Sequence, residues 1–140
     1  MTPETSKCVM ILDERLPLGI LANTAAVLGV ALGAKVPELV GSTVVDQDGT
    51  QHSGIIQIPI PILRGTPDLI CSLRTQTAQL KDQDVIAVDF SDLAQSCKTY
   101  AEFTEKMTAI PEADLQYLGF ALCGPKKLIN RLTGNLPLLR

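Results

Sequence analysis

Apolar and polar positions along the chain form blocks that predict strands and helices in alternation. A continuous apolar run at residues 8–12 is typical of a strand covered on both faces. Leucines and alanines then recur at spacings of three and four over residues 18–32, which is the period of one helix face. Gly33 is the expected end of this helix.

The pattern changes to β structure over residues 41–63. Two apolar segments, residues 42–45 and 54–58, flank Asp48-Gly49, and an Asp-Gly pair is a hairpin signal. Pro59 and Pro61 lack backbone donors, so the second strand should end there or lie at an edge of the sheet.

The second half of the chain repeats the alternation. Thr66-Pro67 is typical of a helix start, and an apolar stripe follows it up to Leu80. A strand is predicted at residues 85–90 and another at residues 115–122. Between them, the Thr99–Glu102 capping box predicts a short helix with Tyr100, Phe103 and Met107 facing inward.

A last helix is predicted after the Gly124-Pro125 turn, with Gly134 as a left-handed cap at its end. The apolar residues 136–139 that follow are available to pack on another surface. Because strands and helices alternate, we expect an α/β fold, a three-layer α/β/α sandwich with a mixed sheet of about four to five strands.

Length and composition narrow the class. A chain of 140 residues, 46% of them hydrophobic, predicts a single domain over residues 1–140. The net charge of −3 argues against a nucleic-acid partner. We expect no membrane span, because no segment reaches roughly 18 apolar residues. The polar N-terminal residues are unlike a signal peptide, which favours a cytoplasmic location.

Four cysteines are present without a CxxC motif, so no zinc site is expected. Cys8, Cys71 and Cys123 lie in apolar surroundings and are expected to be buried, reduced thiols, whereas Cys97 is expected to be the most exposed. The glycine loops lack the Gly-x-Gly-x-x-Gly and Walker patterns, and no cofactor is expected.

The C-terminal segment carries a family resemblance. Residues 115–136 resemble the closing strand, Gly-Pro turn, helix and Thr-Gly-x-Leu end of type 2 peptidyl-tRNA hydrolases. The chain as a whole is more similar to a bacterial group with this fold, domain of unknown function 2000. That likeness rests on the Leu-Pro-x-Gly segment ending at Gly19 and on Ile-Pro-Ile-Pro at residues 58–61. The resemblance implies a peptidyl-tRNA hydrolase type 2-like fold and a homodimer.

The two charged elements of the hydrolase family are not both present. That family has a lysine just after the loop glycine, whereas Gly19 is followed by Ile20 and Leu21. Its Asp-Ala-Gly-x-Thr motif is replaced by residues 88–93, in which Asp89 or Asp92 could supply the carboxylate. Losing one transition-state cation typically lowers the rate of an enzyme by about 10²–10³. This departure from the family therefore favours a repurposed cleft over peptidyl-tRNA hydrolysis.

Open α/β sheets bind ligands where strands end and helices begin, which gives a set of candidate cleft residues. Asn23 is a polar residue in an apolar helix start, although it could simply form a local hydrogen bond there. Tyr100 could line the cleft or anchor the inserted helix. The complete set is Gly19, Asn23, Asp89, Ser91 and Tyr100.

His52 offers a separate possibility. It follows the hairpin turn, and Asp46 or Asp48 could pair with it to make a general base. The alternative is an exposed turn histidine without a chemical role.

Three functions remain open at this stage. The first is binding of a small molecule or a protein partner in the repurposed cleft. The second is a divergent hydrolase or transferase using Asn23, Asp89 and Ser91. The third is a dimeric interaction module without catalysis. Whether the protein is an enzyme is therefore left open.

Overall fold

Two long antiparallel strands that are buried on both faces form the centre of the molecule. The computed structural model describes residues 1–80 and 82–140, and pairs β1 (Ser6–Asp13) with β6 (Tyr117–Pro125). Every residue of β1 except Lys7, and every residue of β6 except Pro125, is buried. The apolar run at residues 8–12 thus forms the doubly covered strand that its composition predicted.

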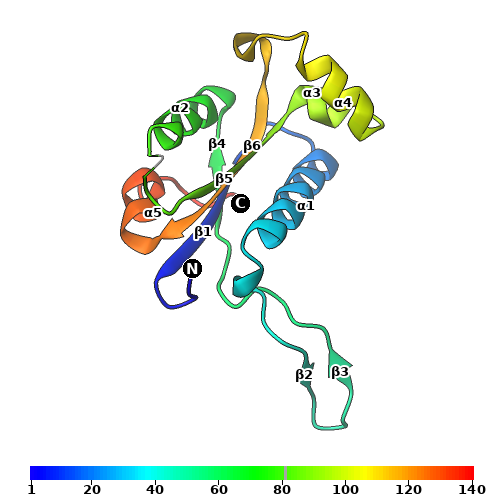
Figure 1. The fold of residues 1–140 in the computed structure, drawn as a ribbon, viewed down its shortest axis with the longest axis vertical. Helices are drawn as coiled ribbons and strands as arrows, with labels where there is room; N and C mark the ends of the chain where they lie inside the picture. The colour runs from blue at the N-terminus through cyan, green and yellow to red at the C-terminus, as the bar shows by residue number, and fades with distance from the viewer. Residues whose placement is uncertain (81) are drawn as a thin grey trace.

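Two shorter strands flank this pair and complete a mixed sheet of order β4-β1-β6-β5 (Figure 1). β4 (Ile62–Gly65) is parallel to β1, and β5 (Ile86–Ser91) is antiparallel to β6. The expected mixed α/β class is therefore confirmed, with four strands in the main sheet and five α-helices among the described residues.

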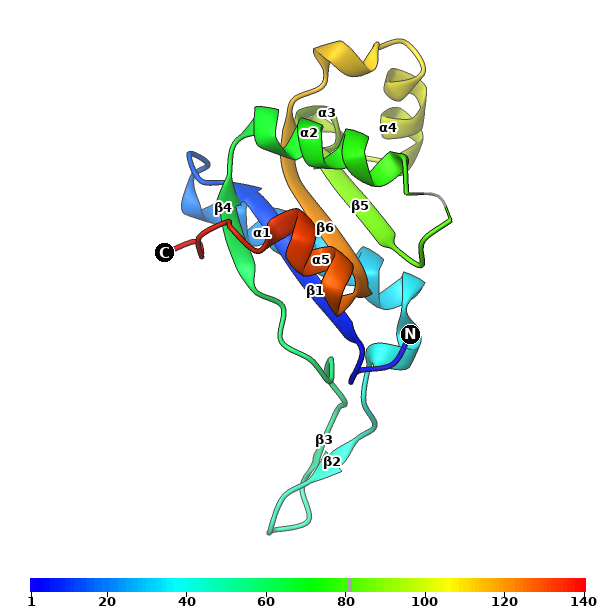
Figure 2. The same cartoon turned by 90° about the vertical axis from the view of Figure 1, so that its left-hand side faces the viewer.

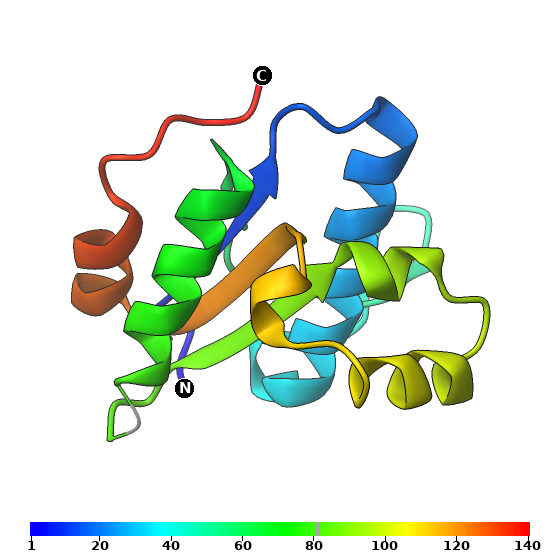
Figure 3. The same cartoon turned by 90° about the horizontal axis from the view of Figure 1, so that it is seen from above.

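Helices lie on both faces of the sheet, so that the described residues form three layers (Figure 3). α1 (Leu18–Lys35) covers one face, and α2 (Pro67–Ala78) and α5 (Lys126–Thr133) cover the other. Successive residues of β1 serve the two cores: Met10 packs with the α1 cluster, and Ile11 packs with the α2 and α5 cluster. This division follows from the two-residue period of a strand.

Three short helical segments connect β5 to β6 and lie beyond one end of the sheet (Figure 1). They are α3 (Asp92–Ser96), α4 (Tyr100–Met107) and the 3₁₀ turn η2 (Glu112–Asp114). The expected N-cap is confirmed, because the Thr99 hydroxyl accepts a hydrogen bond from the Glu102 N–H (3.1 Å), but the capping box is not complete, because the Glu102 carboxylate accepts from the Lys98 N–H (3.1 Å).

A hairpin arm extends away from the body of the molecule (Figure 2). After the 3₁₀ turn η1 (Pro37–Leu39), β2 (Val44–Val45) pairs with β3 (Gln51–His52) around Gly49, whose φ of 84° suits a residue without a side chain. The Asp-Gly turn was predicted correctly, but the second strand was placed too late, at residues 54–58. The ladder closes directly after the turn instead.

Neither glycine that was expected to end a helix does so in the expected way. α1 continues past Gly33 to Lys35. Gly134 has φ −65° and ψ −18°, in the right-handed region, so the left-handed cap is wrong. Its N–H donates to the Asn130 carbonyl oxygen (2.7 Å), which extends the helical hydrogen-bond pattern by one residue.

The apolar segment after α5 covers the outer edge of β4. The Leu139 N–H donates to the Ile62 oxygen (2.8 Å), and the Arg64 N–H donates to the Pro137 oxygen (3.0 Å). From the sequence, this segment was available to pack on another surface. In the structure it packs on β4 of the same chain. β5, in contrast, has no strand along its outer edge among the described residues.

The cysteines depart from the expectation of buried, reduced thiols. Cys8 and Cys123 are buried, but they face each other across β1 and β6 as a disulfide. Cys71 is exposed on α2, and Cys97 is half-buried, which reverses their expected order. The apolar neighbours of Cys71 misled the prediction because they belong to the opposite face of an amphipathic helix.

Among the described residues, α1 alone has the length and composition of a helix that could cross a membrane. No such segment was expected from the sequence. Thr24, Leu28 and Leu32 on its inner side are buried against the sheet, whereas Leu18 and Val30 are exposed. The core helix of a globular domain meets the same length criterion, so this finding by itself is weak evidence for a membrane span.

The contact between α1 and β6 can be tested at Gly119. A methyl group at this position would lie 2.6 Å from Thr24 Cγ2 and 2.9 Å from Leu12 Cδ2. We expect Gly119→Ala to lower the free energy of unfolding by about 1–3 kcal/mol, because packed side chains would have to shift. Urea denaturation measures the change.

Gly33→Ala is the matched control, since nothing lies within 4 Å of its added methyl group. It should leave the stability unchanged or raise it by about 0.5–1 kcal/mol, because alanine favours a helix interior. Equal denaturation midpoints for the two variants would contradict the close packing of α1 on β6.

Candidate functional site

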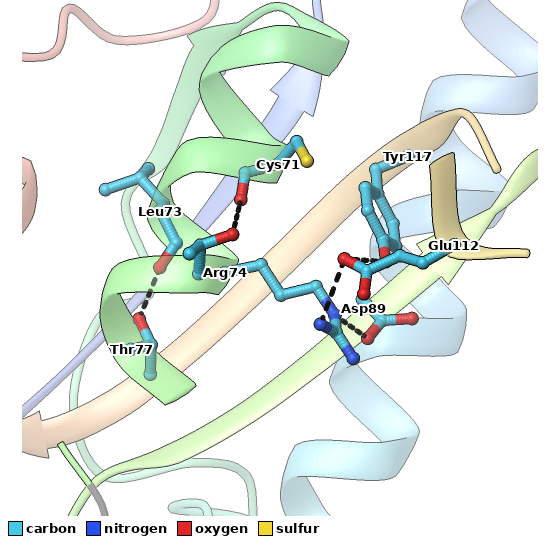
Figure 4. Close-up of polar contacts among 8 residues, drawn as sticks. Cys71, Leu73, Arg74, Thr77, Asp89, Glu112 and Tyr117 are labelled. Carbon is cyan, nitrogen blue, oxygen red and sulfur yellow. Dashed lines mark hydrogen bonds and ion pairs between the residues drawn. The ribbon is translucent and has the colours of Figure 1, made fainter. Parts of the chain in front are cut away.

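Asp89 lies on the outer strand of the sheet, where a polar cluster meets two hollows. It belongs to β5 and pairs with Phe120 of β6 in the ladder. Its Oδ2 accepts a hydrogen bond from Nε of Arg74 in α2 (2.9 Å; Figure 4). The exposed fractions of the two side chains are 35% and 36%, so water screens part of the attraction between them.

Arg74 also joins α2 to the segment that precedes β6. Its Nη1 donates to Glu112 Oε1 (3.3 Å), and its guanidinium carbon lies 5.6 Å from the ring centroid of Tyr117 (Figure 4). The Tyr117 hydroxyl donates to the same Glu112 oxygen (3.3 Å). The hydrogen bond to Asp89 is the main reason that the pKa of Arg74 is raised.

The Tyr117 phenol is neutral at neutral pH. Burial is the main cause that raises its pKa to about 12, while the positive charge of Arg74 acts in the opposite direction. One cation thus faces two carboxylates, Asp89 and Glu112, beside an uncharged phenol. Because both carboxylates already engage the guanidinium, the cluster offers no spare positive charge to an anionic substrate.

A hollow of about 340 Å³ adjoins this cluster between α2 and β5. Arg74 and Asp89 line one part of it, and Ala78, Ala87 and Phe120 form an apolar part. The two polar residues are already paired with each other, so this hollow has few free groups that could orient a ligand.

A second hollow, of about 300 Å³, lies on the α1 side of β5 and is called here the aromatic hollow. Asp89 borders it as well, because β5 is the outermost strand. Its remaining lining comes from α1, β5 and the α3–α4 segment: Val27, Phe90, Ala94, Cys97, Lys98, Thr99, Tyr100 and Phe103.

Two aromatic side chains of α4 form one wall of the aromatic hollow. The Tyr100 and Phe103 rings are 5.6 Å apart and meet edge to face at 78°. Tyr100 is 80% exposed, so its expected inward position is wrong, whereas Phe103 and Met107 are half-buried. The reason is that α4 contacts α3 and the hollow instead of the sheet.

The other candidate residues surround this hollow to different degrees. Asn23 Nδ2 donates to Gln95 Oε1 (2.9 Å), which links α1 to α3. Ser91 is buried, and its hydroxyl accepts from the Ala94 N–H (3.3 Å) as the N-cap of α3. Gly19 is exposed in the first turn of α1, with open space around it.

The structure therefore brings Asp89 and Tyr100 to one hollow. Asn23 and Ser91 lie on elements around that hollow, but their side chains are hydrogen-bonded to Gln95 and to the Ala94 N–H. Gly19 does not line the hollow. Sequence reasoning missed Arg74 and Glu112, which are 38 residues apart in the chain and meet only through the fold.

His52 pairs with Asp46 on the hairpin arm, as the sequence allowed. Its Nε2 lies 2.8 Å from Asp46 Oδ2, and this contact is the main cause that lowers the pKa of Asp46. Both side chains are exposed, and the described residues contain no group of three or more His, Cys, Asp or Glu that could hold a metal ion. The geometry fits an exposed turn histidine.

The environment of Tyr117 can be measured in the Tyr100→Phe variant, because the chain has two tyrosines and no tryptophan. Near-ultraviolet absorbance then reports a single phenol, whose midpoint in the folded protein should be about 12. In urea the midpoint should fall to roughly 10. The raised pKa contributes stability that is present below pH 10 and is lost as the pH rises toward 12. A midpoint near 10 while circular dichroism still shows a folded chain would contradict the burial of Tyr117.

Comparisons with known proteins agree with this architecture. No curated protein matches the chain. A solved structure, the protein of unknown function Atu0240 from Agrobacterium tumefaciens strain C58, is similar with a TM-score of 0.84 and 16% sequence identity. The match covers 96% of this chain and 97% of that one, and it shows a shared fold. The model of the DUF2000 family, a protein family of unknown function, matches residues 6–140, and the chain therefore belongs to this family.

Proposed function

We propose that this domain binds a small molecule in the aromatic hollow. The observation that carries the proposal is the lining of the hollow. Phe90, Tyr100 and Phe103 supply apolar and aromatic surface, and Lys98 and Thr99 supply polar groups beside it. Ligand sites typically combine a mainly apolar lining with a few polar groups that orient the ligand. The hollow also lies beyond the carboxyl end of β5, where open α/β sheets bind ligands.

The lining suggests the chemistry of the ligand. A flat apolar group fits against the edge-to-face pair of Tyr100 and Phe103. Lys98 carries a positive charge at the border of the hollow, so the polar end of a ligand finds a donor there, whereas the Asp89 carboxylate already accepts from Arg74. The half-buried Cys97 thiol lies in the same wall.

We further propose that the arrangement of elements is that of the type 2 peptidyl-tRNA hydrolases. The passage from β6 through Pro125 into α5, followed by Thr133 and Gly134, supports this likeness. The lysine of that family is missing after Gly19, so the proposal concerns the fold and leaves hydrolysis aside.

A divergent hydrolase or transferase is the alternative with less support. It would use Asn23, Asp89 and Ser91, and each of these side chains already has a partner. Each would have to give up a hydrogen bond before it could act on a substrate. Binding without catalysis requires no such rearrangement, and for this reason we favour it.

A cytoplasmic homodimer is part of the same proposal. On the outer side of α1, Leu18 and Val30 are exposed, and contiguous exposed apolar surface is typical of interaction sites. This surface supports self-association, including the case of a dimeric module that carries out no chemistry.

Occupancy of the aromatic hollow can be detected through its thiol. Compounds that raise the melting temperature in a metabolite screen should slow the alkylation of Cys97 by iodoacetamide, because the ligand covers that wall. Cys71, exposed on α2 outside the hollow, should react at an unchanged rate and is the internal control. Mass spectrometry of the two cysteine peptides measures both rates. Stabilising compounds that protect neither thiol, or both equally, would contradict the proposed site.

Tyr100→Ala should weaken the same ligands by about threefold to tenfold, through the loss of one aromatic contact. Val30→Ala is the matched variant, because Val30 is exposed on α1 one turn beyond Val27 and does not border the hollow. It should leave the affinity unchanged.

A further inference from the structure

A third hollow, of about 240 Å³, lies at the opposite end of the sheet from the aromatic hollow. Ser6 and Lys7 of β1 and Lys126 and Asn130 of α5 line one side, and Ile58, Pro59 and Pro61 line the other. In the ladders, Ser6 faces Pro125, whereas Asp89 faces Phe120, five residues earlier in β6. The two hollows therefore occupy different ends of the same sheet, and the inference is independent of the proposed function.

The hollow exists because β4 is shorter than β1. β4 pairs only with Met10–Asp13, and among the described residues no strand lies beside residues 6–9 on that side. Residues 58–61 pass there instead, and Pro59 and Pro61 have no N–H to donate to β1. Contact between the two segments begins where the Met10 N–H donates to the Pro61 oxygen (3.0 Å).

The polar groups of this hollow are hydrogen-bond donors. Lys7 Nζ donates to Asn130 Oδ1 (2.6 Å), which uses the acceptor of this amide and leaves its NH₂ group free to donate. Ser6 is only 4% exposed and borders the hollow beside Lys7. Among residues 1–80 and 82–140, which the structure describes, no carboxylate lies within 4.0 Å of the Lys7 or Lys126 ammonium group.

The start of α5 adds to this excess of positive charge. Lys126 and Lys127 are in its first turn, where the helix dipole favours negative charge, and no acidic residue is present there. The preceding residue, Pro125, provides no side-chain cap. A helix that begins with two cations and no capping group is stabilised when an anion binds beside it.

We propose that this hollow binds a small phosphate monoester. The phosphate lies between the Lys7 and Lys126 ammonium groups and accepts a hydrogen bond from the Asn130 amide. Two lysines balance the nearly double negative charge of a monoester at neutral pH, and charge-assisted hydrogen bonds of this kind are strong. The apolar part of the ligand lies on Ile58 and the adjacent prolines.

A small ester fits better than a nucleic-acid backbone. The hollow is a bounded space of about 240 Å³, and the whole chain carries a net charge of −3, whereas nucleic-acid binders usually present an extended basic face. The backbone phosphates of a nucleic acid are also diesters, each with a single negative charge for the two ammonium groups.

The test is an NMR titration of the full chain with phenyl phosphate, inorganic phosphate, benzoate and a DNA oligonucleotide. We expect phenyl phosphate to shift the amide signals of Ser6, Lys7, Lys126 and Asn130 in a saturable manner, more tightly than inorganic phosphate, which lacks the apolar part. Absence of saturation would overturn the proposal. Benzoate binding as tightly as phenyl phosphate would overturn the assignment of a phosphate, and tighter binding of a DNA oligonucleotide with the same shifts would replace the small ester by a nucleic acid.

Lys126→Gln and Lys127→Gln form a matched pair, since both residues are exposed in the first turn of α5 and only Lys126 lines the hollow. Lys126→Gln should weaken phenyl phosphate about tenfold, through the loss of one charge-assisted hydrogen bond, while Lys127→Gln should change the affinity by less than about twofold. Equal losses in the two lysine variants would show diffuse attraction to a charged surface and would overturn the proposed site.

Discussion

The pairing of β1 with β6 constrains all the other elements of this molecule. Both strands are covered on two faces, so nearly all of their side chains must fit closely between helices. Gly119 shows how little space remains, because Thr24, Leu12 and Leu28 already surround the position where a side chain would begin. The helices on both faces, and through them the two ends of the sheet, take their positions from this ladder.

The two ends of the sheet differ in chemistry for structural reasons. At one end, the segment between β5 and β6 adds short helices whose aromatic side chains remain outside the core. At the other end, β4 stops before β1 does, and a proline segment leaves a gap beside Ser6 and Lys7. A hollow remains at each end because a neighbouring element does not cover the strand beside it. β4 is too short at one end, and the short helices lie too far out at the other.

The sequence was informative where a signal is local and long. The apolar run of β1, the long period of α1, and the capping residues Thr66 and Thr99 all predicted elements that the structure contains. β4 was missed because four residues after two prolines carry too short a pattern. The disulfide between Cys8 and Cys123, and the contact of Arg74 with Glu112, depend on residues that are distant in the chain. Patterns in a single sequence contain no information about such pairs.

Of the candidate site residues, Asp89 and Tyr100 meet at one hollow. The hydrogen-bond partners of Asn23 and Ser91 could not be predicted from the sequence.

The way in which the sheet is assembled has a consequence for synthesis of the protein. β1 forms early in the chain, but its antiparallel neighbour comes from residues 117–125, and the outer edge of β4 is covered by residues up to Leu139. The sheet cannot close until these residues have left the ribosome. Until then the apolar β1 and α1 have no complete core to enter, and such exposed surface is prone to aggregation. The sheet of this domain therefore closes only after β6 has been synthesised, and a nascent chain that still lacks β6 leaves the apolar β1 and α1 without their main packing partner.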